Sequence, residues 1–196
     1  LTPTGRFKEL VLEYINETES VYNEGLLFIK RLIKAAGMLA RIHRKSLDDL
    51  LERVFKFHME GIQRIKRGDS EGYNSYRVAG IEDHLFGHAA DIAQILFNKT
   101  DEMSWLKKAY WLRAVAINKN INQEEVGRYS GFAGQIAREI YKISGNREWA
   151  RRAIRHLEVF VSYCRRNRPR ELRERYISAL RDIGELRRDL EEKVIV

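Results

Sequence analysis

An internal repeat constrains this chain more than any other feature. When the sequence is compared with itself, Trp149 falls on Trp105 at an offset of 44 residues, and the apolar positions on either side coincide. A repeat of this length, in which two amphipathic helices flank a short turn, is the signature of an α-solenoid. The matched pairs are Ala89 with Ala133, Ile92 with Ile136, Ala93 with Ala137, Leu96 with Ile140, Phe97 with Tyr141, Ala109 with Ala153 and Val115 with Val159.

The second copy resembles the tetratricopeptide repeat family. Tyr141, Gly145 and Ala150 stand at the family's spacing for an aromatic near the end of the first helix, a glycine at the turn and an alanine early in the second helix. The first copy departs further from the family pattern, because it has Phe97, Asp101 and Leu106 at these three places. At the next position of the pattern the first copy has Tyr110 and the second copy has Ile154. The offset is also longer than the usual unit of about 34 residues. The resemblance implies antiparallel helical hairpins stacked as a short right-handed α-solenoid.

The pattern along the whole chain predicts an all-α fold, because no segment alternates with the period of a strand. We expect one domain with N-terminal helices over residues 1–68, two helical hairpins over 69–167 and a C-terminal capping helix over 169–196. Asn146 is the expected cap of one helix and Pro169 the expected start of the last. Apolar Leu186 and Leu190 on that last helix suit a dimer contact as well as a monomer, so the oligomeric state is left open.

Composition excludes several classes of protein. The 196 residues are 44% hydrophobic and 33% charged, which is typical of a globular chain, and no apolar run is long enough for a membrane span. The single cysteine, Cys164, favours a reducing cytoplasmic location. The abundance of Arg, Lys and Glu would suit a thermophile. We expect no cofactor, because the sequence has neither a phosphate-binding glycine loop nor a dinucleotide fingerprint.

The tetratricopeptide resemblance implies a binding groove on the first helix of each hairpin. Such a groove mixes aromatic, amide and charged groups, and it would hold a peptide through hydrogen bonds and apolar anchors. The alternative is that the flanking helices cover this face. The implied groove residues are His88, Asp91, Ile95 and Asn98 in the first copy and Phe132, Gln135, Glu139 and Lys142 in the second.

The net charge of +8 is concentrated near the C-terminus. Between Arg147 and Arg175 there are ten arginines, no lysine and four glutamates. Guanidinium groups at this density suit the phosphates of a nucleic acid or an acidic protein partner, while the interleaved glutamates would suit a solvated, ion-paired face. The basic patch comprises Arg151, Arg152, Arg155, Arg165, Arg166, Arg168 and Arg170.

Two polar patterns suggest chemistry. Arg151 and His156 form the arrangement R-x4-H, which resembles the motif of the HEPN ribonucleases, and the resemblance implies a histidine acting as acid or base during RNA cleavage. His84, His88 and Asp91 share one helix face at i, i+4 and i+7 and form a weak metal-binding candidate that needs a further ligand.

These patterns lead to one main interpretation and one alternative. We expect a non-enzymatic scaffold or adaptor that binds a protein or peptide partner through the helical-repeat groove. The alternative is a nucleic-acid-binding or HEPN-like RNA-cleaving protein that uses the arginine-rich patch. Neither interpretation involves a membrane.

Overall fold

The computed structural model describes residues 82–119 and 123–192, together with short helical pieces at 52, 55, 56, 59, 60, 62 and 63. Every element in these stretches is helical, which confirms the all-α prediction at that level. The other expected helical residues before position 82 lie outside the described residues. The helices are α5 (Glu82–Thr100), α6 (Met103–Lys119), α7 (Gln123–Ser144), α8 (Arg147–Asn167), the short 3-10 helix η2 (Arg170–Leu172) and α9 (Arg173–Glu192).

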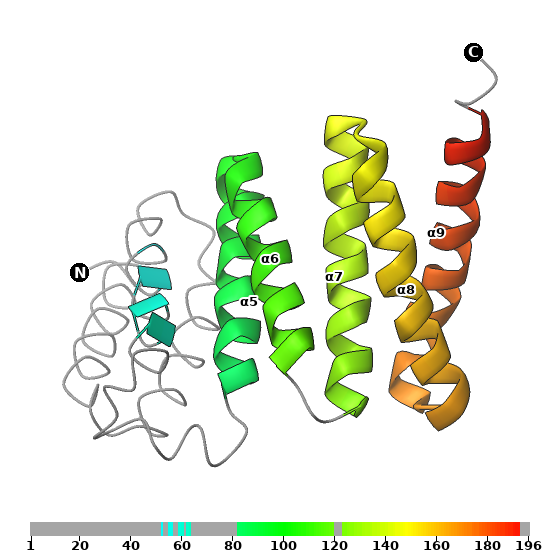
Figure 1. The fold of residues 1–196 in the computed structure, drawn as a ribbon, viewed down its shortest axis with the longest axis horizontal. Coiled ribbons are helices and arrows are strands. Elements are labelled where there is room, and N and C mark those ends of the chain that lie inside the picture. The colour runs from blue at the N-terminus through cyan, green and yellow to red at the C-terminus, as the bar shows by residue number, and fades with distance from the viewer. Residues whose placement is uncertain are drawn as a thin grey trace, which may run out of the picture. The chain divides into compact units, whose positions relative to one another are not determined.

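The chain divides into two compact units, Leu1–Glu102 and Met103–Val196. In the second unit each helix packs on its neighbour in the sequence, so that α6 contacts α7, α7 contacts α8 and α8 contacts α9. Figure 1 shows α7, α8 and α9 side by side. No helix in the described residues combines the length and the apolar character needed to cross a bilayer.

The end of α5 is closed by a compact turn. Thr100 Oγ1 donates a hydrogen bond to the carbonyl of Leu96 at 2.9 Å and accepts one from the amide of Glu102 at 3.3 Å. The amide of Asp101 donates to the carbonyl of Phe97 at 2.8 Å. Asp101 has a positive φ of 55°, a conformation that side chains other than glycine and asparagine adopt at some cost.

The end of α7 has the same turn 44 residues later. Ser144 Oγ donates to the carbonyl of Ile140 at 2.7 Å and accepts from the amide of Asn146 at 3.3 Å. The amide of Gly145 donates to the carbonyl of Tyr141 at 2.8 Å, and Gly145 has a φ of 65°. The correspondence of Asp101 with Gly145 at the turn of the two copies is therefore seen as a shared hydrogen-bond pattern.

The matched apolar positions are also buried alike. In five of the pairs both residues have an exposed fraction of 1% or less, although the residues next to them in the sequence are not the same in the two copies. Val159 is an exception, because it is 44% exposed. The equally buried pairs are Ala89 with Ala133, Ile92 with Ile136, Ala93 with Ala137, Leu96 with Ile140 and Ala109 with Ala153.

The bounds of α8 follow from its caps. Asn146 Oδ1 accepts a hydrogen bond from the amide of Glu148 at 2.9 Å, which confirms the predicted cap. At the other end Arg168 takes the left-handed conformation and its amide donates to the carbonyl of Cys164 at 2.9 Å. Pro169 follows with a φ of −67° and directs the chain into η2 before α9 begins.

Three glycines bring α7 unusually close to α8. A methyl group built on Gly131 would lie 2.9 Å from the ring of Phe160, and one on Gly134 would lie 2.7 Å from Leu157 Cγ. At Gly127 it would lie 2.6 Å from Tyr163 Cβ. Glycine disfavours a helix by about 0.5–1 kcal/mol relative to alanine, so each of these positions sacrifices local helix stability for close packing.

The last helix is fixed to α7 by charge. Arg138 Nη2 donates to Glu185 Oε2 at 2.7 Å and lies 3.2 Å from Asp182 Oδ1, and Asp182 is buried. Leu186, which the sequence suggested as an exposed contact, is instead only 2% exposed. The exposed large apolar residues of α9 are Ile177 and Leu180.

We expect Gly127→Ala to destabilise the protein and Gly184→Ala to stabilise it. The added methyl at Gly127 collides with Tyr163, and such overpacking costs about 1–3 kcal/mol. Gly184 lies in α9 with nothing within 4 Å of the new methyl, so only the helix preference of about 0.5–1 kcal/mol remains. Urea unfolding of both variants measures the two signs. A gain in stability for Gly127→Ala as well as for Gly184→Ala would contradict this expectation. It would mean that α7 and α8 are not in close contact.

Candidate functional site

The predicted groove residues of α7 form a partly open stripe. Gln135 and Lys142 are exposed, while Phe132 and Glu139 are half-buried. Burial raises the pKa of Glu139, and the positive charge of Lys142 partly opposes this rise. Among the described residues the stripe is thus partly covered at Phe132 and Glu139 and accessible at Gln135 and Lys142, and the groove stays a prediction.

Two arginines that the sequence pattern did not predict lie against Phe132. The guanidinium carbon of Arg175, from α9, is 4.1 Å from the centre of the Phe132 ring, and that of Arg113, from α6, is 4.7 Å away. Burial lowers the pKa of Arg175, and the positive charges of Arg113 and Arg128 lower it further by smaller amounts. Arg175 Nη2 is buried without a hydrogen-bond partner among the described residues. The face of α7 thus carries an aromatic ring beside two guanidinium groups.

The predicted groove residues of the first copy all lie on α5, in the other compact unit. His88, Asp91 and Ile95 are half-buried and Asn98 is exposed. His88 Nδ1 lies 3.9 Å from Asp91 Oδ2. The side chain of His84 lies outside the described residues, and within them no three His, Cys, Asp or Glu side chains gather to hold a metal. The metal candidate therefore stays a prediction.

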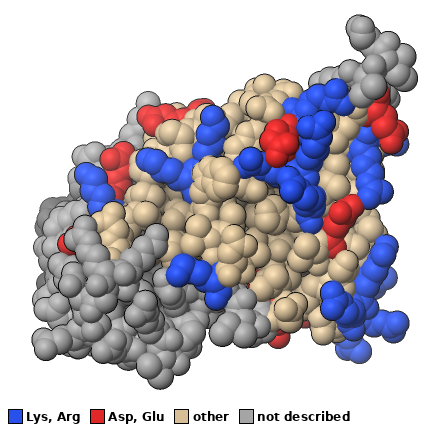
Figure 2. Space-filling view, in the orientation of Figure 1, with Lys and Arg blue, Asp and Glu red and all other residues tan. Residues whose placement is uncertain are grey.

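The arginines of the basic patch fall into two groups. In the first half of α8, Arg151, Arg152 and Arg155 all lie within 4 Å of the carboxylate of Glu148, at 3.8, 3.2 and 3.5 Å. This part of the patch is an ion-paired face, in which red and blue atoms intermix at the upper right of Figure 2. A single carboxylate serves three guanidinium groups there.

The second group surrounds the turn between α8 and α9, where Arg173 joins three arginines of the patch, and we call it the arginine turn. Its side chains border a cavity of about 480 Å³, and blue atoms gather there at the lower right of Figure 2. Among the described residues none of these four arginines has a carboxylate partner, and Arg165 Nε donates to Tyr176 Oη at 3.4 Å. The arginine turn consists of Arg165, Arg168, Arg170 and Arg173, with Cys164, Pro169 and Tyr176 beside them. Arg166 is exposed near the end of α8 but does not border the cavity.

Cys164 lies beneath this turn and is buried. Burial raises the pKa of its thiol, and the nearby Arg175 only partly opposes the rise. The cysteine is therefore a protonated packing residue at neutral pH, as a thiol within a helix interface is expected to be.

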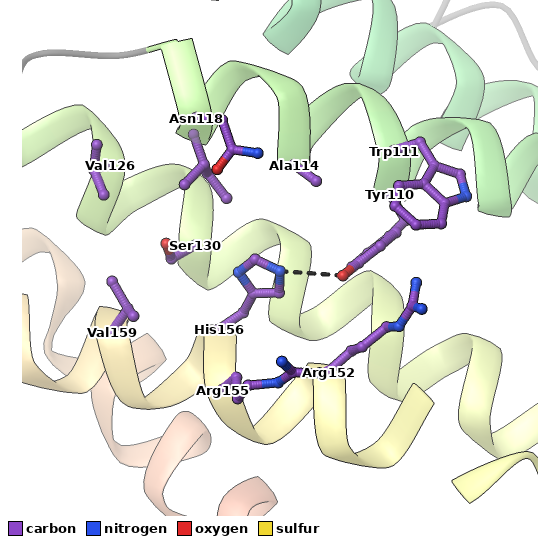
Figure 3. A pocket seen from close by; sticks show the side chains of 11 residues that line it. Tyr110, Trp111, Ala114, Asn118, Val126, Ser130, Arg152, Arg155, His156 and Val159 are labelled. Atoms are coloured by element: carbon purple, nitrogen blue, oxygen red, sulfur yellow. Dashed lines mark hydrogen bonds between the residues drawn. The ribbon is translucent and has the colours of Figure 1, made fainter. Parts of the chain in front are cut away.

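A second cavity, of about 490 Å³, lies between α6, α7 and α8 (Figure 3). Tyr110 Oη and His156 Nε2 are 3.2 Å apart across it and share a hydrogen bond. The guanidinium of Arg152 lies over the rings of Trp111 and Trp149, at 5.0 and 4.9 Å from their centres. The lining residues are Tyr110, Trp111, Ala114, Ile117, Asn118, Val126, Ser130, Arg152, Arg155, His156 and Val159.

His156 is neutral at physiological pH. Burial lowers its pKa from 6.5 to about 4, and the charges of Arg155 and Arg152 add to the shift. At pH 7 this histidine is in its neutral form, which accepts a proton rather than donating one, and the role that the R-x4-H resemblance implied stays a prediction. Arg151, the other residue of that pattern, does not line the cavity, whereas Arg152 and Arg155 do.

Comparisons with known proteins add no functional information. No family model matches the chain, and no curated protein matches it. One solved structure, described as the DHF58 filament, aligns over 97% of this chain and 91% of that chain. Its TM-score is 0.41 and its sequence identity is 18%, and no argument follows from a match at that level.

We expect His156 to make the protein less stable as the pH falls from 6.5 towards 4. In this interval the unfolded histidine is protonated while the folded one stays neutral, so the unfolded state binds more protons. The free energy of unfolding is nearly unaffected by this group above pH 6.5 and is lower by about 2 kcal/mol near pH 4.5. Urea unfolding at pH 7.5 and 4.5 should show a larger loss for the wild type than for His156→Gln. Identical losses in the two proteins would contradict the lowered pKa.

Proposed function

We propose that this protein is a non-enzymatic adaptor that binds a peptide segment of a protein partner along α7. The observation that carries the proposal is the stripe of Phe132, Gln135, Glu139 and Lys142, in which an aromatic ring and a carboxylate are half-buried beside two exposed polar side chains. Binding faces of this kind combine one aromatic anchor with adaptable polar groups. The repeated turn and the equally buried repeat positions support a helical-repeat scaffold of the tetratricopeptide type as the frame for this face.

The surroundings of Phe132 indicate what such a peptide offers. Arg175 presents a buried hydrogen-bond donor beside the ring, so a backbone carbonyl or an acidic side chain of the peptide would be bound there. An apolar side chain of the peptide would cover the exposed part of Phe132. Glu139 and Lys142 then provide one charge of each sign further along the helix, which would fix the direction of the peptide.

We expect peptides selected from a random display library against the purified protein to depend on this stripe. Phe132→Ala removes the aromatic anchor and should weaken binding about 30-fold, since an anchor of this kind contributes about 2 kcal/mol. Lys142→Glu changes an exposed charge without altering packing and should weaken binding at least severalfold. Lys107→Glu, an exposed residue of α6, is the matched control and should bind as the wild type does.

Two results would contradict the adaptor proposal. The first is a library in which no sequence is enriched over a bait-free selection. The second is a set of selected peptides that bind Phe132→Ala and Lys142→Glu with wild-type affinity. Thermal unfolding of each variant confirms that it is folded, so that a loss of binding is not mistaken for a loss of structure.

A second candidate function is nucleic-acid binding at the arginine turn. The observation that favours it is the contrast between its four arginines, which have no carboxylate partner among the described residues, and the arginines that pair with Glu148. Clustered guanidinium groups repel one another, and a negatively charged partner would reduce this repulsion. The first turn of α9 lies beside them, and a helix start also favours anions.

We expect the double variant Arg168→Gly/Arg170→Ala to test this candidate. Glycine suits the left-handed backbone of Arg168, so the variant loses two charges without loss of the turn. If the turn binds RNA or DNA, the slope of log affinity against log salt should become less steep by about 1–2. Arg151→Ala/Arg187→Ala removes two ion-paired charges and should change the slope much less. Absence of binding at low salt would rule out the candidate.

A further inference from the structure

The cavity between α6, α7 and α8 has features of a built site that neither proposed function uses. Its walls are largely apolar, and its volume of about 490 Å³ is within the range of small-molecule sites. Trp111 and Val159 stand at its rim with 51% and 44% of their surfaces exposed. Exposed apolar side chains around a cavity offer contact area to the body of a ligand.

One residue that lines the cavity has a buried hydroxyl that makes no hydrogen bond among the described residues. Ser130 is 1% exposed, and its Oγ has no hydrogen-bond partner among the described residues. A buried, unpaired hydroxyl costs about 1–3 kcal/mol, and such a cost is unusual in a native protein unless a water or ligand satisfies the group. Ser130 therefore marks the place where a ligand's polar group would be bound.

His156 provides a second hydrogen-bonding atom at the same place. Figure 3 shows its ring between Ser130 and Tyr110. The bond to Tyr110 is the only hydrogen bond that the ring makes among the described residues, and it involves Nε2, so Nδ1 remains available. When Tyr110 donates to Nε2, the proton of the neutral ring is on Nδ1, and Nδ1 becomes a donor.

The charges around the cavity select the sign of the ligand. Arg152 and Arg155 both line it, and their single carboxylate neighbour, Glu148, does not. A cation would be repelled, while an anion would gain from both guanidinium groups and from the hydroxyl and imidazole donors. The positive surroundings also agree with the lowered pKa of His156.

We propose that this cavity binds a small organic anion whose carboxylate or phosphate group reaches Ser130 and His156 and whose apolar body packs against Trp111. Carboxylates and phosphate monoesters share the anionic oxygens that this set of donors recognises, so both belong to the proposed class. The site lies away from the Phe132 stripe and from the arginine turn, so the inference does not rest on either proposed function.

Three matched ligands test the proposal with the full chain. Saturable quenching of tryptophan fluorescence by 4-phenylbutyrate is expected, because Trp111 lines the cavity. The neutral 4-phenylbutanamide has nearly the same shape and should bind at least tenfold more weakly, since hydrogen bonds to a charged group are the stronger ones. Comparison with 3-phenylpropyl phosphate then shows whether the site favours carboxylate or phosphate.

Ser130→Ala gives a pair of effects that a merely structural role would not produce. The free variant should have a higher melting temperature than the wild type, because the unpaired hydroxyl is gone. Its affinity for the better anion should nevertheless be about tenfold lower, because one hydrogen bond to the ligand is lost. Opposite movements of stability and affinity are expected of a residue retained for binding.

Two arginines of α8 provide the charge control. Arg155 lines the cavity and Arg151 does not, although both are exposed and both lie beside Glu148. Arg155→Ala should weaken anion binding severalfold, and Arg151→Ala should leave it unchanged. The proposal is overturned if neither anion binds saturably, if the amide binds as well as the acids, or if Ser130→Ala and Arg155→Ala bind as the wild type does.

Discussion

The close approach of α7 to α8 is the interaction on which the second unit depends. It requires glycine at 127, 131 and 134, because Tyr163, Phe160 and Leu157 occupy the space that larger side chains would need. The same approach places Ser130 and His156 at one cavity, since each lies beside a residue of this contact. Phe132 lies at the flank of this contact, where Arg175 reaches both its ring and that of Phe160. The cavity and the stripe therefore border the same helix contact.

Charge is distributed differently over the two ends of α8. At its start Glu148 lies within ion-pair distance of three arginines one or two turns away, which is the spacing at which helix side chains meet. At its end the chain leaves the helix through a left-handed residue and a proline, and the arginines of the arginine turn form no ion pair among the described residues. A single run of arginines is thus divided into a part that shares one carboxylate and a part that shares none.

Local signals in the sequence predicted the helices, the Asn146 cap and the paired turns, because caps, glycine and proline act over a few residues. The stripe on α7 could also be counted from a single helix. The arginines beside Phe132 come from α6 and α9, and the partners of His156 come from α6 and α7, so these contacts depend on packing that no spacing encodes. Leu186 shows the same limit, since its apolar side chain was assigned to a surface but is covered by neighbouring helices. Ser130 gave no signal at all, because a lone serine in a helix is unremarkable until its surroundings are known.

The paired turns have a consequence for how such a chain can change its length. Because the turns at Asp101 and Gly145 have matching hydrogen bonds, a cassette cut after each of them, residues 102–145, would have matching ends. A duplicated cassette would join to its neighbours through turns that already exist, and no new loop would have to be invented. Recombination within such a gene would thus preserve local geometry at both junctions, and protein engineers could use the same two cut points.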